Sequence, residues 1–297
     1  MTLTSNDTIK KLENSIPKFI NNQPVPKDIL PIIAAYIQLN NETIEKAVKD
    51  YFAYDLTYSD DKNLKQQVIK KYGLISSWDV SQVTDMDHLF AGIHCFNEDI
   101  SNWDVSNVTN MRMMFWNCEN FNKDISNWDV SKVTYMFGMF HLALTFNQPL
   151  NNWNVSKVTC MDYMFMYARL FDQPLNNWNV SNVKYMDYMF YNATSFNQPL
   201  NNWNVSKVKT MKATFVWTYK FNQPLNNWNV SNVKNMKAMF NSAEAFNQPL
   251  NNWNVSNVSN MKTIFGNAIK FNQSIDNWDL SNVRNIELMF KNDLPPM

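Results

Sequence analysis

The chain has 297 residues and no formal net charge, because 26 Lys and Arg balance 26 Asp and Glu. Net charge by itself therefore predicts neither a nucleic acid nor an acidic membrane as the partner. Hydrophobic residues make up 45% of the chain and charged residues 18%, which argues against a disordered protein. With only 4 Gly and 3 Cys, a glycine-rich β-roll and a closed disulfide framework are both excluded.

Residues 1–76 predict a helical entry and capping module that precedes a repeat array over residues 77–297. Apolar residues at helical spacing predict one amphipathic helix around residues 44–52 and a second that ends at Tyr72. Gly73 fits the C′ position of the second helix. Such a module would cover the open end of a stacked array.

The stretch VPKDILPIIAAYI within residues 20–40 faintly resembles the opening of an F-box, with Pro26, Ile29, Leu30 and Ile33 at the matching apolar positions. That resemblance implies an adaptor for the ubiquitin machinery. An amphipathic packing helix explains the same residues equally well, and both interpretations stay open.

Neither a spanning helix nor a secretory signal is predicted. The longest nearly continuous apolar run, 29–37, is much shorter than the roughly 20 residues that a spanning helix needs, and the first residues lack the features of a cleaved leader. Five turns begin an N-V-S glycosylation sequon at one position, where stacked glycans would crowd one another. We therefore expect an intracellular location and a mature chain that is the whole chain.

Nine tryptophans stand 25 residues apart without an insertion or deletion. They are Trp78, Trp103, Trp128, Trp153, Trp178, Trp203, Trp228, Trp253 and Trp278. We number the positions of each turn from its Trp, so that +2 is the second residue after it. Val recurs at +2 and +5, Met at +8, Phe at +12 and +18, and Ile or Leu three residues before the Trp. One unit cannot bury so many apolar groups alone, so we predict a solenoid of nine stacked turns whose core holds Trp103 through Trp253.

Each turn is predicted to hold one short strand and one short helix, which makes the fold an α/β solenoid. The strand is placed around the Trp and its following Val, for example Leu150 to Val155. Ser156 and its equivalents are predicted to cap the helix, because the apolar residues after it fall at spacings of three, four and three, on one helical face.

The repeat W-[DN]-V-S-x-V-x-x-M, preceded by F-N-Q-P-L-N-N, resembles the 25-residue repeat of BspA-like leucine-rich-repeat proteins over residues 75–290. That family includes mycoplasma surface lipoproteins and multigene families of protists and giant viruses. The resemblance implies a leucine-rich-repeat-like solenoid that binds proteins or surfaces and carries no catalytic residue. Because no signal and no lipidated Cys stand at the start, an intracellular or virion-associated member is expected.

Catalytic and metal-binding residues are sparse, so we expect no enzyme, no cofactor and no metal. The three histidines lie at different positions of the repeat, and no nucleophile recurs beside one of them. A zinc site built from His88, His94, Cys95 and Cys118 is conceivable, but packing explains these cysteines better. An aspartate ladder at +1 of turns one to three could attract Ca²⁺, although a solvated acidic rim is the preferred interpretation. The ladder consists of Asp79, Asp104 and Asp129, flanked by Asp99 and Asp124.

The binding surface is sought at the variable positions +7, +9, +10, +13 and +14, because stacking explains the positions that every turn shares. Aromatic residues at such positions are typical anchors of protein interfaces, although packing between turns is an equal alternative. The candidates are Trp116, Tyr135, Phe137, Tyr163, Tyr167, Tyr185, Tyr188, Tyr191 and Trp217. Lysines on turns five to eight, Lys207, Lys209 and Lys212 among them, make a basic side, which an acidic protein partner or plain solubility explains better than nucleic acid does.

The sequence thus predicts a non-enzymatic scaffold for protein–protein interaction. The alternatives are a structural or adhesive component of a virion or cell surface and, more weakly, an F-box-like adaptor. Residues 77–150 carry a net charge of −6 and residues 151–275 carry +7, so the zero total hides a dipolar rod. Head-to-tail self-association that added salt weakens is therefore expected.

Overall fold

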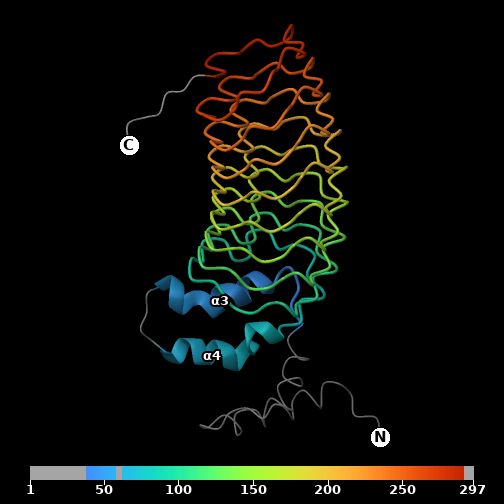
Figure 1. Ribbon diagram of the computed structural model, residues 1–297. Coiled ribbons are helices and arrows are strands. Elements are labelled where there is room, and N and C mark those ends of the chain that lie inside the picture. Colours follow the sequence, from blue (N-terminus) through green and yellow to red (C-terminus); the bar gives the residue numbers. More distant parts are fainter. Residues whose placement is uncertain (1–37, 58–61, 291–297) are drawn as a thin grey trace, which may run out of the picture.

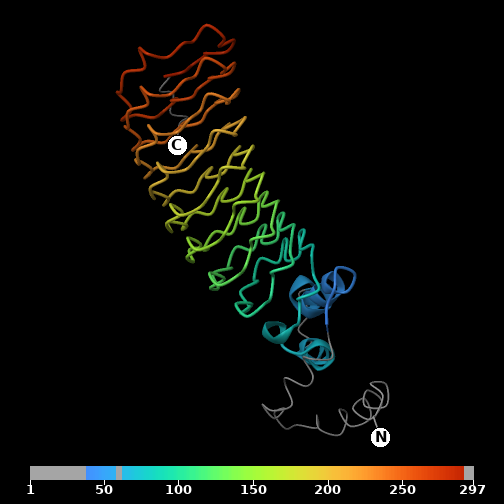
Figure 2. The same cartoon turned by 90° about the vertical axis from the view of Figure 1, so that its right-hand side faces the viewer.

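The computed structural model describes residues 38–57 and 62–290, which form a rod with two helices at one end and stacked turns along its length (Figure 1 and Figure 2). The residues of the F-box resemblance lie outside these ranges. Within them, no helix is long and apolar enough to cross a membrane. The division into a module over residues 1–76 and an array over residues 77–297 stays a prediction.

Both predicted helices of the N-terminal segment are present. Helix α3 spans Ile44–Thr57, and α4 spans Lys62–Tyr72 and ends at Gly73, whose φ is +74°. A 3₁₀ turn, Ile75–Ser77, leads into the array. Helix α3 covers the first turn, because the ring of Phe52 packs at 5.5 Å from that of Phe96.

A backbone ladder joins each turn to the next. The N–H groups at +8, +10, +12 and +14 donate to carbonyls at +7, +9, +11 and +13 of the following turn. From turn four to turn five these are the N–H groups of Met161, Tyr163, Phe165 and Tyr167, at 2.7 to 3.0 Å. One parallel bridge per turn, at +7, is the only sheet pairing between turns of the described array. Neighbouring turns of the solenoid are therefore held together by backbone hydrogen bonds from every second residue of this segment.

The predicted short helix is wrong. In nearly every turn the N–H groups at +11 and +13 donate three residues back, as Met164 does to Met161, so the segment is a run of β-turns. Every described +10 and +14 residue from turn one to +10 of turn nine has a positive φ, which for non-glycine residues lies between 49° and 61°. Positive φ at the third turn position alone is the geometry of a type II turn. A helix of only two helical turns has marginal stability. In the structure, by contrast, the N–H groups at +8, +10, +12 and +14 are paired with carbonyls of the following solenoid turn.

The predicted strand and helix cap also differ from the structure. The segment from Leu150 to Val155 contains a turn, in which the Trp153 N–H donates to the Leu150 carbonyl. Ser156 does not cap a helix: its own N–H donates to Oδ1 of Asn154. This local turn, typical of Asn and Asp, competes with regular structure and recurs in every turn of the array.

Three columns of aromatic rings run through the core, between columns of Val, Met and Leu or Ile. Neighbouring tryptophans stack at 6.2 to 6.5 Å, and in turns five to nine their ring planes differ by only 1° to 4°. The +12 phenylalanines stack at about 5.6 Å and contact the +18 column within each turn. The indole N–H of Trp178 donates to the carbonyl of Leu150 in the preceding turn. Successive turns are thus almost unrotated, and each position forms a straight column.

Asn and Gln side chains add a second ladder along the exposed side. Oδ1 of Asn147 at +19 accepts from the backbone N–H of Asp172 and from Nε2 of Gln173 in the next turn. The same pair of bonds recurs along turns four to eight. The uniform F-N-Q-P sequence is therefore explained by stacking and not by recognition.

The positive φ at +10 makes a matched pair of alanines informative. Ala238 lies at +10 with a φ of 57°, whereas Ala243 is fully buried at +15 and has no positive φ. Because a left-handed conformation costs an L-residue about 1 kcal/mol, Ala238→Gly is expected to be neutral or slightly stabilising. Ala243→Gly is expected to lose about 1 kcal/mol or more. Thermal unfolding of the two variants measures the difference, and equal destabilisation would contradict the turn geometry.

Candidate functional site

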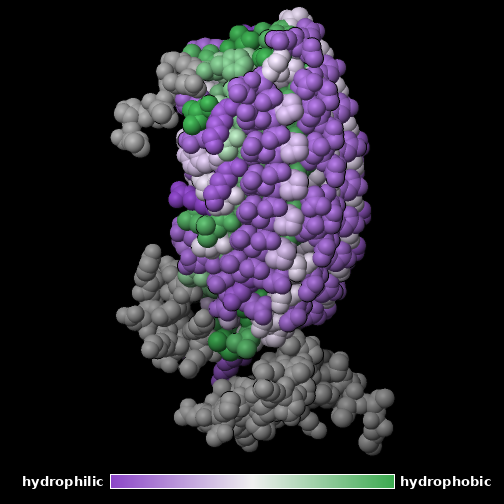
Figure 3. Space-filling model, viewed as in Figure 1, coloured by the Kyte–Doolittle hydropathy of each residue, from purple (hydrophilic) through white to green (hydrophobic). Residues whose placement is uncertain are grey.

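Half-buried aromatic side chains on turns two to six make one continuous surface, the aromatic patch. Its members are Trp116, Phe137, His141, Tyr163, Tyr167, Tyr188, Tyr191 and Trp217. They project from positions +9, +10, +13 and +14, because the type II turns alternate outward and inward pairs of residues. The long face shown in Figure 3 is largely polar. The structure thus brings together seven of the nine aromatic candidates and adds one histidine.

Ring contacts connect the patch along the rod. Tyr163 and Tyr188 stack at 4.8 Å on adjacent turns, and Tyr191 meets Trp217 edge to face at 5.1 Å. Cations lie over rings at both ends: the Arg112 guanidinium is 5.5 Å from the Phe137 ring, and Lys212 Nζ is 5.0 Å from the Tyr188 ring. These contacts hold the rings in place, so less side-chain entropy is lost when a partner binds.

Four of the candidates lie outside the patch. Tyr135 and Tyr185 occupy the bridge position +7, where they are 50% and 39% exposed. Lys207 and Lys209 line a separate groove, whereas Lys212 belongs to the end of the patch. The sequence grouped these residues because it showed which positions vary, but not toward which side each one points.

Two carboxylates lie beneath the tyrosines. Asp162 Oδ1 accepts from the backbone N–H of Asp187, whose own Oδ1 accepts from the N–H of Lys212 and the hydroxyl of Thr210. Burial raises the pKa of Asp162 to about 6 and also raises the pKa of Asp187. Burial likewise raises the pKa of Tyr191 to about 12, so its phenol stays protonated at neutral pH. The patch therefore offers hydroxyl donors close to weakly acidic carboxyls.

His141 is a member that the sequence did not single out for binding. Its ring lies 6.2 to 6.5 Å from those of Trp116, Tyr163 and Tyr167, and its Nδ1 is buried without a hydrogen-bond partner among the described residues. Burial lowers its pKa from 6.5 to about 4. The neutral ring therefore completes the patch at physiological pH. Its position +13, shared with Trp116 and Tyr191, is the only signal that could have found it.

The residues of the considered zinc site do not form a ligand cluster. His94 contacts Glu119 at 3.2 Å, and the Cys118 thiol is buried against the Phe90 carbonyl at 3.1 Å. Burial also raises the pKa of Cys118. In the described ranges, no group of three or more His, Cys, Asp or Glu residues could hold a metal ion.

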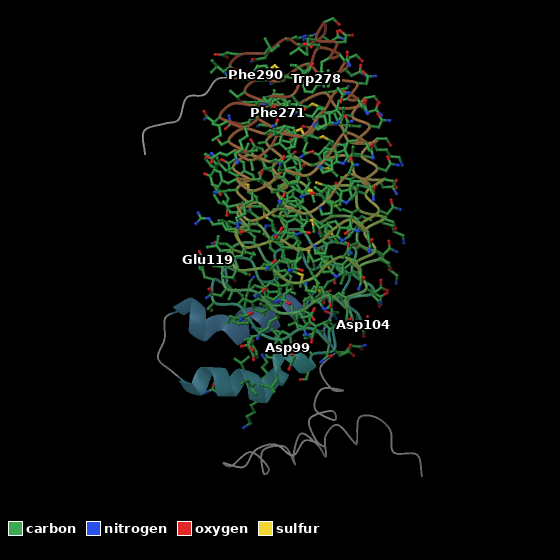
Figure 4. All side chains as sticks on the ribbon, in the orientation of Figure 1. Asp99, Asp104, Glu119, Phe271, Trp278 and Phe290 are labelled. Carbon is green, nitrogen blue, oxygen red and sulfur yellow. The ribbon has the colours of Figure 1, made fainter. Side chains whose placement is uncertain are left out.

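The aspartate ladder has a structural role instead. Asp104 and Asp129 each accept from the backbone N–H two residues on, from Ser106 and Ser131. Hydrogen bonds from the hydroxyls and N–H groups of these serines lower the pKa of both carboxyls. Figure 4 shows Asp104 and Glu119 on opposite sides of the lower turns, so the acidic groups surround this part of the rod.

Comparison with known proteins gives one family. The family model described as a mycoplasma protein of unknown function, DUF285, matches residues 62–165, 138–218 and 200–294. Together these segments cover the whole array and the helix that precedes it. No curated protein matches the chain.

The burial of His141 predicts a pH effect on stability. Between pH 6.5 and about 4 the unfolded chain takes up a proton that the folded chain does not, so unfolding becomes easier as the pH falls. His141→Phe keeps an aromatic ring and removes this term, so its melting temperature should fall less between pH 7 and pH 5 than that of the original chain. His94→Asn, at a histidine whose side chain is 60% exposed, serves as the control. Identical pH dependence in all three proteins would show that the patch does not bury His141.

Proposed function

Since the chain belongs to the DUF285 family, whose description assigns no activity, we propose its function from its surface: a non-enzymatic scaffold that binds another protein through the aromatic patch. The aromatic patch carries this proposal, because eight half-buried rings in contact form the kind of surface that anchors interfaces. Each ring can bury further area at little entropic cost. The straight columns beneath provide a rigid base.

We also propose a family relationship and a cellular location for this protein. The W-[DN]-V-S-x-V-x-x-M repeat supports a place among the BspA-like leucine-rich-repeat proteins, including those of protists and giant viruses. An intracellular or virion-associated protein fits the stacked glycosylation sequons. No cofactor, metal or membrane insertion enters this function.

A second candidate function is structural, as a component that assembles end to end. The last described turn exposes Ile286, Leu288 and Phe290, each between 41% and 51%. In the earlier turns, the backbone N–H groups at these positions donate to the following turn. In this last turn they donate to no carbonyl of the described residues. Figure 4 places Phe290, Phe271 and Trp278 at this end, opposite the acidic turns. Apolar surface together with segregated charge favours head-to-tail contact between copies.

The main proposal is tested by replacing the central tyrosines with residues that the repeat itself uses at the same positions. Tyr163→Ala and Tyr188→Ala copy Ala238, and Tyr191→Asn copies Asn241. A displayed-peptide library selected on the full chain provides ligands. Their affinity for the triple variant should fall at least about tenfold, since hot-spot aromatics often contribute 2 kcal/mol or more each.

The control is Tyr135→Asn, which copies Asn110 at the bridge position and lies outside the patch. It should change affinity less than about twofold. Ligands that bind the triple variant as well as the original chain would contradict the assignment of this surface.

Sedimentation velocity tests the structural candidate. Oligomers of the full chain should dissociate as salt rises from about 50 mM to about 500 mM, because screening shortens the reach of the segregated charges. A sedimentation coefficient that is monomeric, or oligomeric but insensitive to salt, would count against charge-driven assembly.

A further inference from the structure

A groove of about 460 Å³ on turns five to seven is lined almost entirely by lysines, and we call it the lysine groove. Lys184, Lys209 and Lys234 occupy +6 of three successive turns, with Lys207 and Asn232 beside them at +4. All five residues are exposed or half-buried along their length and the groove opens to solvent. It is separate from the aromatic patch.

The three +6 lysines lie on directly paired backbone positions. The N–H of Lys209 donates to the Lys184 carbonyl and that of Lys234 to the Lys209 carbonyl, both at 2.9 Å. Neighbouring turns at this pairing distance are about 4.8 Å apart, a separation at which like charges destabilise each other. The fold therefore carries a repulsion here that a neutral side chain would remove.

The repeat uses such neutral side chains at +6 in five of its nine turns. Turns one to four have Thr and turn eight has Ser, whereas turn nine has Arg284; the hydroxyls of Thr134 and Ser259 donate to the preceding turn. Stacking therefore does not require Lys at this position. The change to Lys in three consecutive turns needs a separate reason.

Nothing in the described chain neutralises these charges. No ion pair joins the four groove lysines to a carboxylate among residues 62–290, and Lys207 Nζ contacts the amide oxygen of Asn182 instead. Residues 178–252 contain seven Lys but only Asp187 and Glu244 as acidic groups. Asp187 is already engaged by Thr210 and the Lys212 N–H. A straight row of unpaired ammonium groups is therefore available to an external anion.

We propose that the lysine groove binds an acidic, extended segment of the partner protein, an inference that rests on the proposed scaffold function. In an extended chain, alternate side chains on one face are about 6.6 to 7 Å apart, within reach of lysines on successive turns. The walls are aliphatic lysine stems with one amide from Asn232, which suits a peptide. No aromatic ring of the described residues lines the groove, so they provide no stacking platform of the kind that single-stranded nucleic acid needs.

The test uses the full chain and a labelled peptide of alternating Glu and Ser, with binding followed by fluorescence anisotropy at about 50 mM salt. The variant Lys184→Thr, Lys209→Thr, Lys234→Ser restores the residues of the other turns, and it should bind the peptide at least about tenfold more weakly. The control Lys123→Gln, Lys220→Ser, Lys270→Ser removes the same total charge outside the groove and should stay within about twofold. Near-UV circular dichroism of the stacked tryptophans checks that all proteins are folded.

The proposal is overturned if the groove variant binds as tightly as the original chain, or if both triple variants lose affinity equally. Tighter binding of an oligouridylate of equal charge, lost in the groove variant, would assign the groove to nucleic acid and also overturn it. The tyrosine variants of the aromatic patch should keep their affinity for the Glu-Ser peptide. Failure of the patch with library ligands and failure of the groove with this peptide are therefore separate results.

Discussion

The backbone ladder between turns is the constraint on which the rest of the structure depends. In the segment from +8 to +14, alternate N–H groups donate to the next turn, and those at +11 and +13 close β-turns within their own turn. Such a pattern works only if each turn repeats the same path 25 residues later. The stacked Trp and Phe columns fill the interior that the ladder encloses, and their near-parallel planes show how little the turns rotate. Neither element would be stable in one turn alone.

The same constraint explains where variation is possible. Core positions +8 and +12 are nearly invariant, whereas +10 and +14, the positions with positive φ, accept residues as different as Tyr163, Ser242 and Trp217. A positive φ is costly for such side chains, yet the ladder holds it in every turn. The aromatic patch is built on these positions and on +9 and +13, which precede them. Stability and recognition are thus divided between alternating pairs of residues of one segment.

Much of the fold could be predicted from the sequence. The 25-residue period, the buried Trp column and the two helices α3 and α4 follow from spacing and amphipathicity. The short helix of each turn was wrong because apolar residues at spacings of three and four suit consecutive β-turns as well as a helix. No sequence feature indicated the positive φ at +10 and +14, since the only glycines at these positions are Gly92 and Gly138.

The candidate site was predictable in part. Variable aromatic positions led to most of the patch, but Tyr135 and Tyr185 point elsewhere because +7 is the paired position. His141 belongs to the patch because its ring contacts aromatic rings of the adjacent turns. These contacts cannot be read from the order of residues in the sequence. The lysine groove arises in the same way: Lys184, Lys209 and Lys234 are 25 residues apart in sequence, and only the stacking of turns makes them adjacent.

Deleting one repeat in register and one out of register tests the ladder most directly. Removal of residues 163–187 joins Asp162 to Tyr188 and keeps the phase, whereas removal of residues 164–187 leaves one extra residue within the ladder. The first protein is expected to keep the near-UV signal of stacked tryptophans and to unfold cooperatively. The second should lose that signal or melt far lower, because one added residue reverses the alternation of N–H groups. Equal melting of the two deletion proteins would show that the ladder does not depend on the 25-residue register.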